Sequence, residues 1–220
     1  MRIVSWNVLA QDFDYKKRIP LICKEIQDVD PDVICIQEAI PAFGEIILAF
    51  FSDYVSPFEH VYVNNTSARP YGEIILSRLP IVASGYKFLR SYNGRVNSWI
   101  DIDCEGSLLR VNTAHLESCQ DSKYKDIRQI QLKQIVEMNK DVDRWVWIGD
   151  SNLGVDEENS MHSTGDSTYY GNRFYKNASE YEYDKVWLNN LELRSVSLIG
   201  TEQIDGIWLS DHDGLVVDIK

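Results

Sequence analysis

The feature that most limits how this chain can fold is a series of short apolar runs, rich in β-branched residues, that recur along its length. Runs of this kind, bounded by turn-forming residues, predict β-strands. The predicted strands cover residues 2–8, 33–37, 60–63, 73–77, 81–86, 98–103, 108–114, 145–148, 185–188, 204–209 and 214–219. Helical periodicity is confined to residues 15–27, 41–51 and 122–139. Many strands and few helices favour an α/β fold in which two sheets pack face to face with helices outside.

Two polar side chains follow the predicted strand 145–148, in the segment Gly149-Asp150-Ser151-Asn152. Because side chains alternate faces in an extended chain, Asp150 and Asn152 point the same way. A carboxylate that accepts a proton, beside an amide that donates a hydrogen bond, suits attack by water on a phosphoryl group. The alternative is a strand that ends in an Asx turn, which Asp-Ser-Asn also forms.

Four other predicted strands end in polar groups. They supply Asn7, Glu38, His115, and the pair Asp211 and His212. Each has a structural alternative: an Asn satisfied by a loop, a solvated edge carboxylate, a packed His, or a polar hairpin turn. The recurrence of such groups at successive strand ends favours one shared site.

Taken in this order, the motifs resemble the endonuclease/exonuclease/phosphatase superfamily, which includes DNase I and the apurinic/apyrimidinic endonucleases. The superfamily pattern is matched by Trp6-Asn7, Gln37-Glu38, His115, Gly149-Asp150-Ser151-Asn152 and Ser210-Asp211-His212. The resemblance implies a four-layer α/β/β/α sandwich, in which helices flank two packed, mostly antiparallel sheets. It also implies that residues 1–220 form a single catalytic domain, with its site where strand-end loops meet.

Within the superfamily the chain is most similar to the 5′-tyrosyl-DNA phosphodiesterases, which release a tyrosine, left by a trapped topoisomerase, from a DNA 5′ phosphate. The similarity rests on residues 37–41 (Gln-Glu-Ala-Ile-Pro), 113–118 (Thr-Ala-His-Leu-Glu-Ser), 149–153 and 183–187. Two departures concern the substrate. Gly154 stands where that family commonly has an Arg that assists the phosphate, and residues 167–170 lack the family's groove Trp.

The resemblance implies a catalytic role for each motif. Asp150 orients and deprotonates the attacking water. The hydrogen-bond donors to the phosphoryl oxygens are Asn7, Asn152, His115 and His212. A second carboxylate orients His212 and raises its basicity, and both Asp184 and Asp205 are candidates for this role.

The expected cofactor is Mg²⁺, with Mn²⁺ as an alternative. Mg²⁺ takes hard oxygen ligands and keeps several waters, so few protein carboxylates are needed. We expect Glu38 to be the main ligand, with Asn7 and Asp211 as helpers. The sequence has no Cys/His cluster of the kind that binds zinc.

Residues 154–182 lack clear periodicity and are rich in tyrosine. A long loop inside a compact domain is usually functional or mobile, and this one directly follows Asn152. We expect it to shape the substrate site through Tyr169, Tyr170 and Arg173. The alternative is a solvated excursion.

The net charge of −12 opposes a grip on long duplex nucleic acid. The small basic clusters, Arg95 among them, are typical of solvated faces. Acidity therefore argues for a small footprint, such as a strand end or a small phosphodiester. The resemblance implies a nucleic-acid 5′ end that carries a covalently linked tyrosine or peptide as the partner. The four cysteines (Cys23, Cys35, Cys104 and Cys119) have no metal-binding or redox spacing, and Cys23 and Cys35 are expected in the core. Free thiols predict an intracellular protein, nuclear or cytoplasmic, and we expect a monomer without a membrane segment.

These observations predict a Mg²⁺-dependent phosphodiesterase that hydrolyses 5′-phosphotyrosyl bonds at DNA or RNA ends, as in repair of topoisomerase adducts. The alternative is another superfamily phosphodiesterase or nuclease, of the deadenylase/2′-phosphodiesterase or apurinic endonuclease type. Residues 5–11 (Ser-Trp-Asn-Val-Leu-Ala-Gln) are similar to the start of the deadenylase branch. A third possibility is a binding module that has kept the fold and lost the chemistry.

Overall fold

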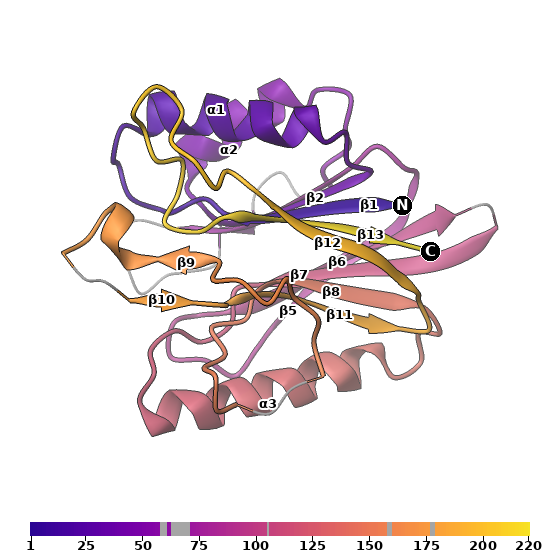
Figure 1. Ribbon diagram of the computed structural model, residues 1–220. Helices are drawn as coiled ribbons and strands as arrows, with labels where there is room; N and C mark the ends of the chain where they lie inside the picture. The colour runs from indigo at the N-terminus through magenta and orange to yellow at the C-terminus, as the bar shows by residue number, and fades with distance from the viewer. Residues whose placement is uncertain (58–60, 63–70, 105, 158–159, 177–178) are drawn as a thin grey trace.

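Two β-sheets lie face to face between two layers of helices (Figure 1). The computed structural model describes residues 1–57, 61–62, 71–104, 106–157, 160–176 and 179–220. Helices α1 (Tyr15–Asp28) and α2 (Pro41–Phe50) cover the outer face of one sheet, and α3 (Ser122–Asn139) covers that of the other. The predicted four-layer α/β/β/α sandwich is confirmed.

The first sheet has six strands in the order β12-β13-β1-β2-β4-β3. Their bounds are β12 (Leu193–Ile199), β13 (Gly214–Ile219), β1 (Arg2–Asn7), β2 (Val33–Ala39), β4 (Gly72–Ser77) and β3 (Val61–Tyr62). Only β1 and β2 pair in parallel among these neighbours. The parallel pairing puts the ends of these two strands at the same edge of the sheet.

The second sheet has five strands in the order β11-β8-β7-β6-β5. Their bounds are β11 (Asp184–Asn189), β8 (Trp145–Asp150), β7 (Ser107–Ala114), β6 (Val96–Cys104) and β5 (Ile81–Phe88). Here β7 and β8 are the parallel pair. A separate ribbon of β9 (Tyr169–Tyr170) and β10 (Glu180–Tyr181), joined through the 3-10 helix η1 (Gly171–Arg173), projects beside one end of the sandwich (Figure 1).

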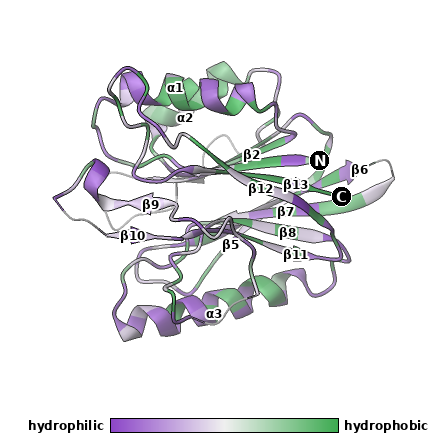
Figure 2. Cartoon of the chain, in the orientation of Figure 1, coloured by the Kyte–Doolittle hydropathy of each residue, from purple (hydrophilic) through white to green (hydrophobic). Residues whose placement is uncertain are grey.

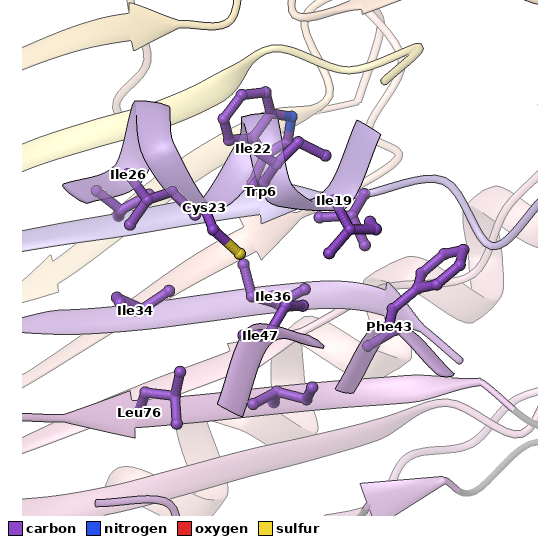
Figure 3. Packing of buried hydrophobic residues seen from close by; sticks show 14 of the residues in the cluster. Trp6, Ile19, Ile22, Cys23, Ile26, Ile34, Ile36, Phe43, Ile47 and Leu76 are labelled. Carbon is purple, nitrogen blue, oxygen red and sulfur yellow. The ribbon is translucent and has the colours of Figure 1, made fainter. Parts of the chain in front are cut away.

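The core has three parts: one between the sheets, one beneath α1 and α2, and one beneath α3. In α1, Ile19, Ile22, Cys23 and Ile26 recur at helical spacing and are buried against Ile34 and Ile36 of β2 (Figure 3). The hydropathy colouring in Figure 2 shows hydrophobic residues concentrated in α1, α2 and the strands, whereas η1 is hydrophilic. Cys23 and Cys35 are both buried, as predicted. No helix in the described part of the chain is long and apolar enough to cross a bilayer.

The prediction of a strand at residues 204–209 is wrong. Ile204 and Ile207 pair across a tight turn whose two central residues have positive φ, 52° at Asp205 and 77° at Gly206. Besides β1, the antiparallel partner of β13 is β12, which was not predicted. β12 is an edge strand with partly exposed side chains. Polar residues are tolerated there, and Arg194, Ser195 and Ser197 interrupt the apolar run by which a strand is predicted. Of the predicted strand 60–63, only Val61–Tyr62 is described; residues 60 and 63 lie outside the described chain.

Candidate active site

The polar residues predicted at the strand ends meet at the edge of the sandwich that carries β9 and β10 (Figure 1). Six of them line one cleft of about 340 Å³: Glu38, His115, Asp150, Asn152, Asp211 and His212. Asn7 and Asp184 contact this set from the protein interior. All eight predicted catalytic residues are therefore gathered in one place.

Asp150 is the centre of the cluster. Its Oδ2 accepts a hydrogen bond from Asn7 Nδ2 at 2.9 Å and lies 3.3 Å from His115 Nε2 and 3.6 Å from His212 Nε2. Burial raises the pKa of Asp150 to about 6, although the neighbouring His212 charge opposes the shift. The other oxygen accepts the backbone N–H of Asn152 at 3.0 Å. The Asx turn considered as an alternative is thus present, and it is the turn that presents Asp150 to the cleft.

His212 is held in its cationic form by two carboxylates. Its Nδ1 lies 2.8 Å from Asp184 Oδ2, and the indole N–H of Trp6 fixes the His212 carbonyl at 2.9 Å. Burial lowers the pKa of His212, but the charges of Asp184 and Asp150 outweigh it and raise the pKa to about 10. Asp205 lies exposed in the 204–207 turn, so the geometry selects Asp184 as the residue that orients His212.

His115, unlike His212, is held as a neutral imidazole. Its pKa is lowered well below the usual value by burial and by the nearby charges of Arg95 and His212. The guanidinium Nη2 of Arg95 lies 3.1 Å from His115 Nε2, so this nitrogen accepts and Nδ1 carries the proton. The cleft therefore holds one neutral and one cationic imidazole on either side of Asp150, a separation of pKa values that is typical of catalytic sites.

A divalent cation fits one end of this cleft. Glu38 stands at a β-bulge with φ of 59°, where its Oε2 accepts the Ala10 N–H at 2.8 Å and its side chain stays partly exposed. Burial raises the pKa of Asp211 to about 6, and the Glu38 charge adds to the shift although His212 opposes it. Two neighbouring, partly desolvated carboxylates suit Mg²⁺, which keeps most of its waters. In the described chain no group of three or more His, Cys, Asp or Glu residues is placed to hold a metal ion, so the candidate ligands are these two carboxylates.

Asn7 is less available as a metal ligand than the sequence suggested. Its amide nitrogen donates to Asp150, and its amide oxygen accepts the Leu9 N–H at 3.1 Å. Both ends of the amide are therefore engaged in holding the loop and the carboxylate. Of the three residues predicted as metal ligands, Glu38 and Asp211 line the cleft.

The three residues predicted to bind substrate, all in β9 and η1, do not lie in the same pocket. Tyr169 lines the cleft, where it packs edge-on against His212 with ring centroids 5.1 Å apart. Tyr170 and Arg173 line a separate hollow of about 580 Å³. There Arg173 is paired with Asp213 at 2.6 Å and stacked on the Tyr170 ring, so both side chains are used inside the protein. The structure does not place Tyr170 and Arg173 in the cleft.

Several cleft residues were not predicted from the sequence: Tyr71, Arg95, Ser118, Cys119, Ser179, Tyr181 and Tyr183. Tyr181 and Tyr183 stack at 4.8 Å and, with Tyr169, form an aromatic wall. Arg95 is buried rather than solvated. At Gly154, a Cβ atom would come within 2.9 Å of Gln120 Oε1, the end of a flexible side chain, so a larger residue here requires Gln120 to move. Arg95 brings a cation to the cleft from another loop.

Comparison with known proteins agrees with this geometry. The model of the endonuclease/exonuclease/phosphatase family matches residues 4–212, and the chain belongs to this family. Membership of this family supports a phosphodiesterase- or nuclease-like hydrolase function.

Two curated relatives, from zebrafish (Danio rerio) and human (Homo sapiens), are both tyrosyl-DNA phosphodiesterase 2. They are 24% and 21% identical over 98% and 99% of this chain, and the matches cover 65% and 67% of their own lengths. The chain thus spans just under two thirds of the zebrafish relative. A crystal structure of zebrafish tyrosyl-DNA phosphodiesterase 2 complexed with single-strand DNA product superposes with a TM-score of 0.83 at 22% identity, covering 100% of this chain and 98% of that chain. At this identity the likeness shows the fold.

Proposed function

We propose that residues 1–220 form a Mg²⁺-dependent catalytic domain that hydrolyses 5′-phosphotyrosyl bonds at nucleic-acid ends. The observation that carries the proposal is the position of buried Asp150 between neutral His115 and cationic His212. The names of the relatives support the tyrosyl substrate. The single-strand product bound to the zebrafish relative supports a nucleic-acid end as the other half of the substrate.

The side chains divide the work of the reaction. Asp150, with a pKa of about 6, is ionised near neutral pH and accepts a proton from the attacking water. The water oxygen forms a bond to phosphorus as the bond from phosphorus to the tyrosyl oxygen breaks. His212, protonated at both ring nitrogens, donates from Nε2 to a phosphoryl oxygen, and Asn152 donates from its amide. Glu38 and Asp211 would hold the divalent cation, which would supply positive charge for the phosphoryl oxygens.

The leaving group fits the chemistry of the cleft. A phenol has a pKa of about 10, so a phenolate departs more readily than a sugar alkoxide and needs less protonation. The wall of Tyr169, Tyr181 and Tyr183 offers flat apolar faces to an aromatic ring or a base. Arg95 contacts His115 and so places a second positive charge near Asp150, besides that of His212.

The test is incubation with a single-stranded oligonucleotide carrying a 5′ phosphotyrosine, first with Mg²⁺ and then with a chelator. We expect release of a 5′-phosphate end that is lost with chelator and in Asp150→Asn. Hydrolysis of an oligoadenylate or of unmodified nucleic acid, without release of tyrosine, would overturn the tyrosyl assignment in favour of the deadenylase or endonuclease alternative. No hydrolysis of any of these phosphodiesters, together with no effect of Glu38→Ala on ligand binding, would support a binding module.

A further inference from the structure

A patch at the rim of the cleft is formed by Tyr92, Lys123 and Tyr124, and we call it the rim patch. The Lys123 ammonium lies 4.5 Å from the centre of the Tyr124 ring and 6.0 Å from that of Tyr92. The two rings meet edge to face with centroids 6.0 Å apart, and Tyr92 is 60% exposed. Lys123 forms no ion pair with any residue in the described part of the chain. The patch thus presents to solvent an aromatic surface and a cation, which is hydrogen-bonded to the Tyr124 side chain and attracted by Asp121.

The rim patch is tied rigidly to the cleft. The buried Glu117 carboxylate accepts the Ser91 hydroxyl at 2.5 Å and the Tyr92 N–H at 3.2 Å, which fixes the loop that carries Tyr92. The Asn93 amide donates to Ser118 Oγ at 3.0 Å, and Ser118 itself lines the cleft. Both segments of the patch therefore continue directly from cleft residues, Arg95 on one side and Ser118 on the other.

The charge of this rim is opposite to that of the whole chain. Its two segments, residues 90–95 and 118–125, contain four basic residues against the single acid Asp121. Lys125 is paired with Asp156 and Arg95 is buried beside His115, so Arg90 and Lys123 carry the exposed positive charge. The chain as a whole has 34 acidic and 22 basic residues. The rim around β9 and β10 carries Asp166 and Glu180 against Lys176, while its Glu182 is paired with Lys185 and its Arg173 with Asp213. A polyanion that leaves the cleft is therefore attracted toward the rim patch and repelled by the other side.

We infer that the rim patch binds the single-stranded continuation of the nucleic acid whose 5′ end lies in the cleft. This inference rests on the proposed function for the identity of that end. Unpaired bases stack on Tyr92 and Tyr124, and Lys123 contacts a backbone phosphate between them, the combination by which proteins hold single strands without reading sequence. A duplex is not recognised in this way, because its bases are stacked on each other.

The test compares 5′-phosphotyrosyl substrates of two lengths, a dinucleotide that ends within the cleft and a strand of about ten nucleotides that reaches the patch. We expect the ratio of kcat/KM, long over short, to fall about tenfold in Lys123→Ala and in Tyr92→Ala, the loss of one stacked base or one phosphate contact. Lys123→Arg should restore the ratio. Lys140→Ala, which removes an exposed lysine just beyond the far end of α3, is the matched control and should leave the ratio unchanged.

A second readout separates this inference from the proposed function. Affinity for a long 5′-phosphorylated strand without tyrosine is measured by fluorescence anisotropy at several salt concentrations. The salt slope should fall by about 0.7 in Lys123→Ala, as expected for one lost phosphate contact on a single strand. Equal affinity and slope in wild type and Lys123→Ala, or tighter binding of duplex than of single strand, would overturn the inference. Failure of the wild type to release tyrosine from either substrate would count against the proposed function only.

Discussion

His212 Nδ1 lies 2.8 Å from Asp184 Oδ2, while its Nε2 lies 3.6 Å from Asp150 Oδ2. The imidazole thus lies between two buried carboxylates: Nδ1 donates to Asp184, and Nε2 faces Asp150 at ion-pair distance. Thr168 Oγ1 donates to the same Asp184 oxygen at 2.7 Å, so Asp184 is itself fixed in position. His212 is consequently a permanent cation aimed at the place where negative charge develops on phosphorus, rather than a base.

Replacement of Asp184 tests this relationship. In Asp184→Asn the largest raising charge is lost, so the pKa of His212 should fall from about 10. We expect kcat to fall by about ten- to a hundredfold, the usual effect of removing a carboxylate that orients a catalytic histidine. The pKa is measured from the pH dependence of the imidazole NMR signals. Asp205→Asn is the matched control; an equal loss of kcat there would return Asp205 to consideration.

Most of the site could be predicted from the sequence because its residues follow the ends of predicted strands. Asn7, Glu38, His115 and Asp150 each stand at or next to the end of an apolar run, and parallel pairing of β1 with β2 and of β7 with β8 brings such ends together. The hydrophobic pattern of the strands also predicted the sandwich. For these residues, position along the chain and position in space are linked by the geometry of the sheet.

The features that the sequence did not reveal depend on contacts between distant segments. Arg95 belongs to the loop before β6, and only tertiary packing turns it toward His115 rather than toward water. Arg173 was expected to bind substrate because the loop around it is irregular, but Asp213 lies 40 residues away along the chain. The edge strand β12 was missed because its partly solvated side chains weaken the apolar pattern on which the prediction relied.

Glu73 should give the protein an unusual pH dependence of stability. Burial raises its pKa to about 7 although the Arg95 charge opposes the shift, and its Oε2 has no hydrogen-bond partner in the described structure. The unfolded chain releases this proton near the ordinary pKa of 4.5, whereas the folded protein retains it until about 7. Because the unfolded state is the more readily ionised, the contribution of Glu73 to stability becomes more unfavourable as pH rises through this window.

Glu73→Gln removes that cost. Relative to wild type, the variant should gain about 2 kcal/mol of unfolding free energy between about pH 5 and pH 8. Urea denaturation at both pH values measures the gain. Glu137→Gln removes an exposed carboxylate on α3 and serves as the control. A wild-type and Glu73→Gln difference that stays constant with pH would show that Glu73 is ionised in the folded protein at both values.

Metal binding should be visible in stability as well as in activity. In chelator, Glu38 raises the pKa of the neighbouring Asp211 through repulsion, and Glu38→Gln relieves it. We therefore expect Glu38→Gln to be at least as stable as wild type without metal. With Mg²⁺, wild type should gain stability in proportion to the logarithm of metal concentration, whereas the variant should gain little. Thermal melts across a Mg²⁺ titration test this, with Glu45→Gln on the exposed face of α2 as control. Equal gains in wild type and Glu38→Gln would place the metal elsewhere.

Asp213, which directly follows His212 in the sequence, is paired with Arg173. The guanidinium is 2.6 Å from Asp213, contacts the Ser210 carbonyl at 3.4 Å, and is sandwiched between the rings of Tyr170 and Trp208 at 4.1 and 4.3 Å. It therefore clamps the loop that carries Asp211 and His212. Removal of one partner leaves the other charge buried, so Arg173→Met should cost about 3–5 kcal/mol of unfolding free energy.

A double-mutant cycle separates this clamp from a substrate-binding role. If Arg173 acts through Asp213, the stability cost of Arg173→Met/Asp213→Asn should be well below the sum of the single costs. Each single variant leaves one buried charge unpaired, whereas the double variant leaves none. kcat should partly recover in the double variant for the same reason, since the His212 loop regains its position. If Arg173 instead contacts the substrate, Arg173→Met should raise KM with little loss of stability, and Asp213→Asn should rescue nothing. Urea denaturation and steady-state kinetics on the four proteins distinguish these outcomes.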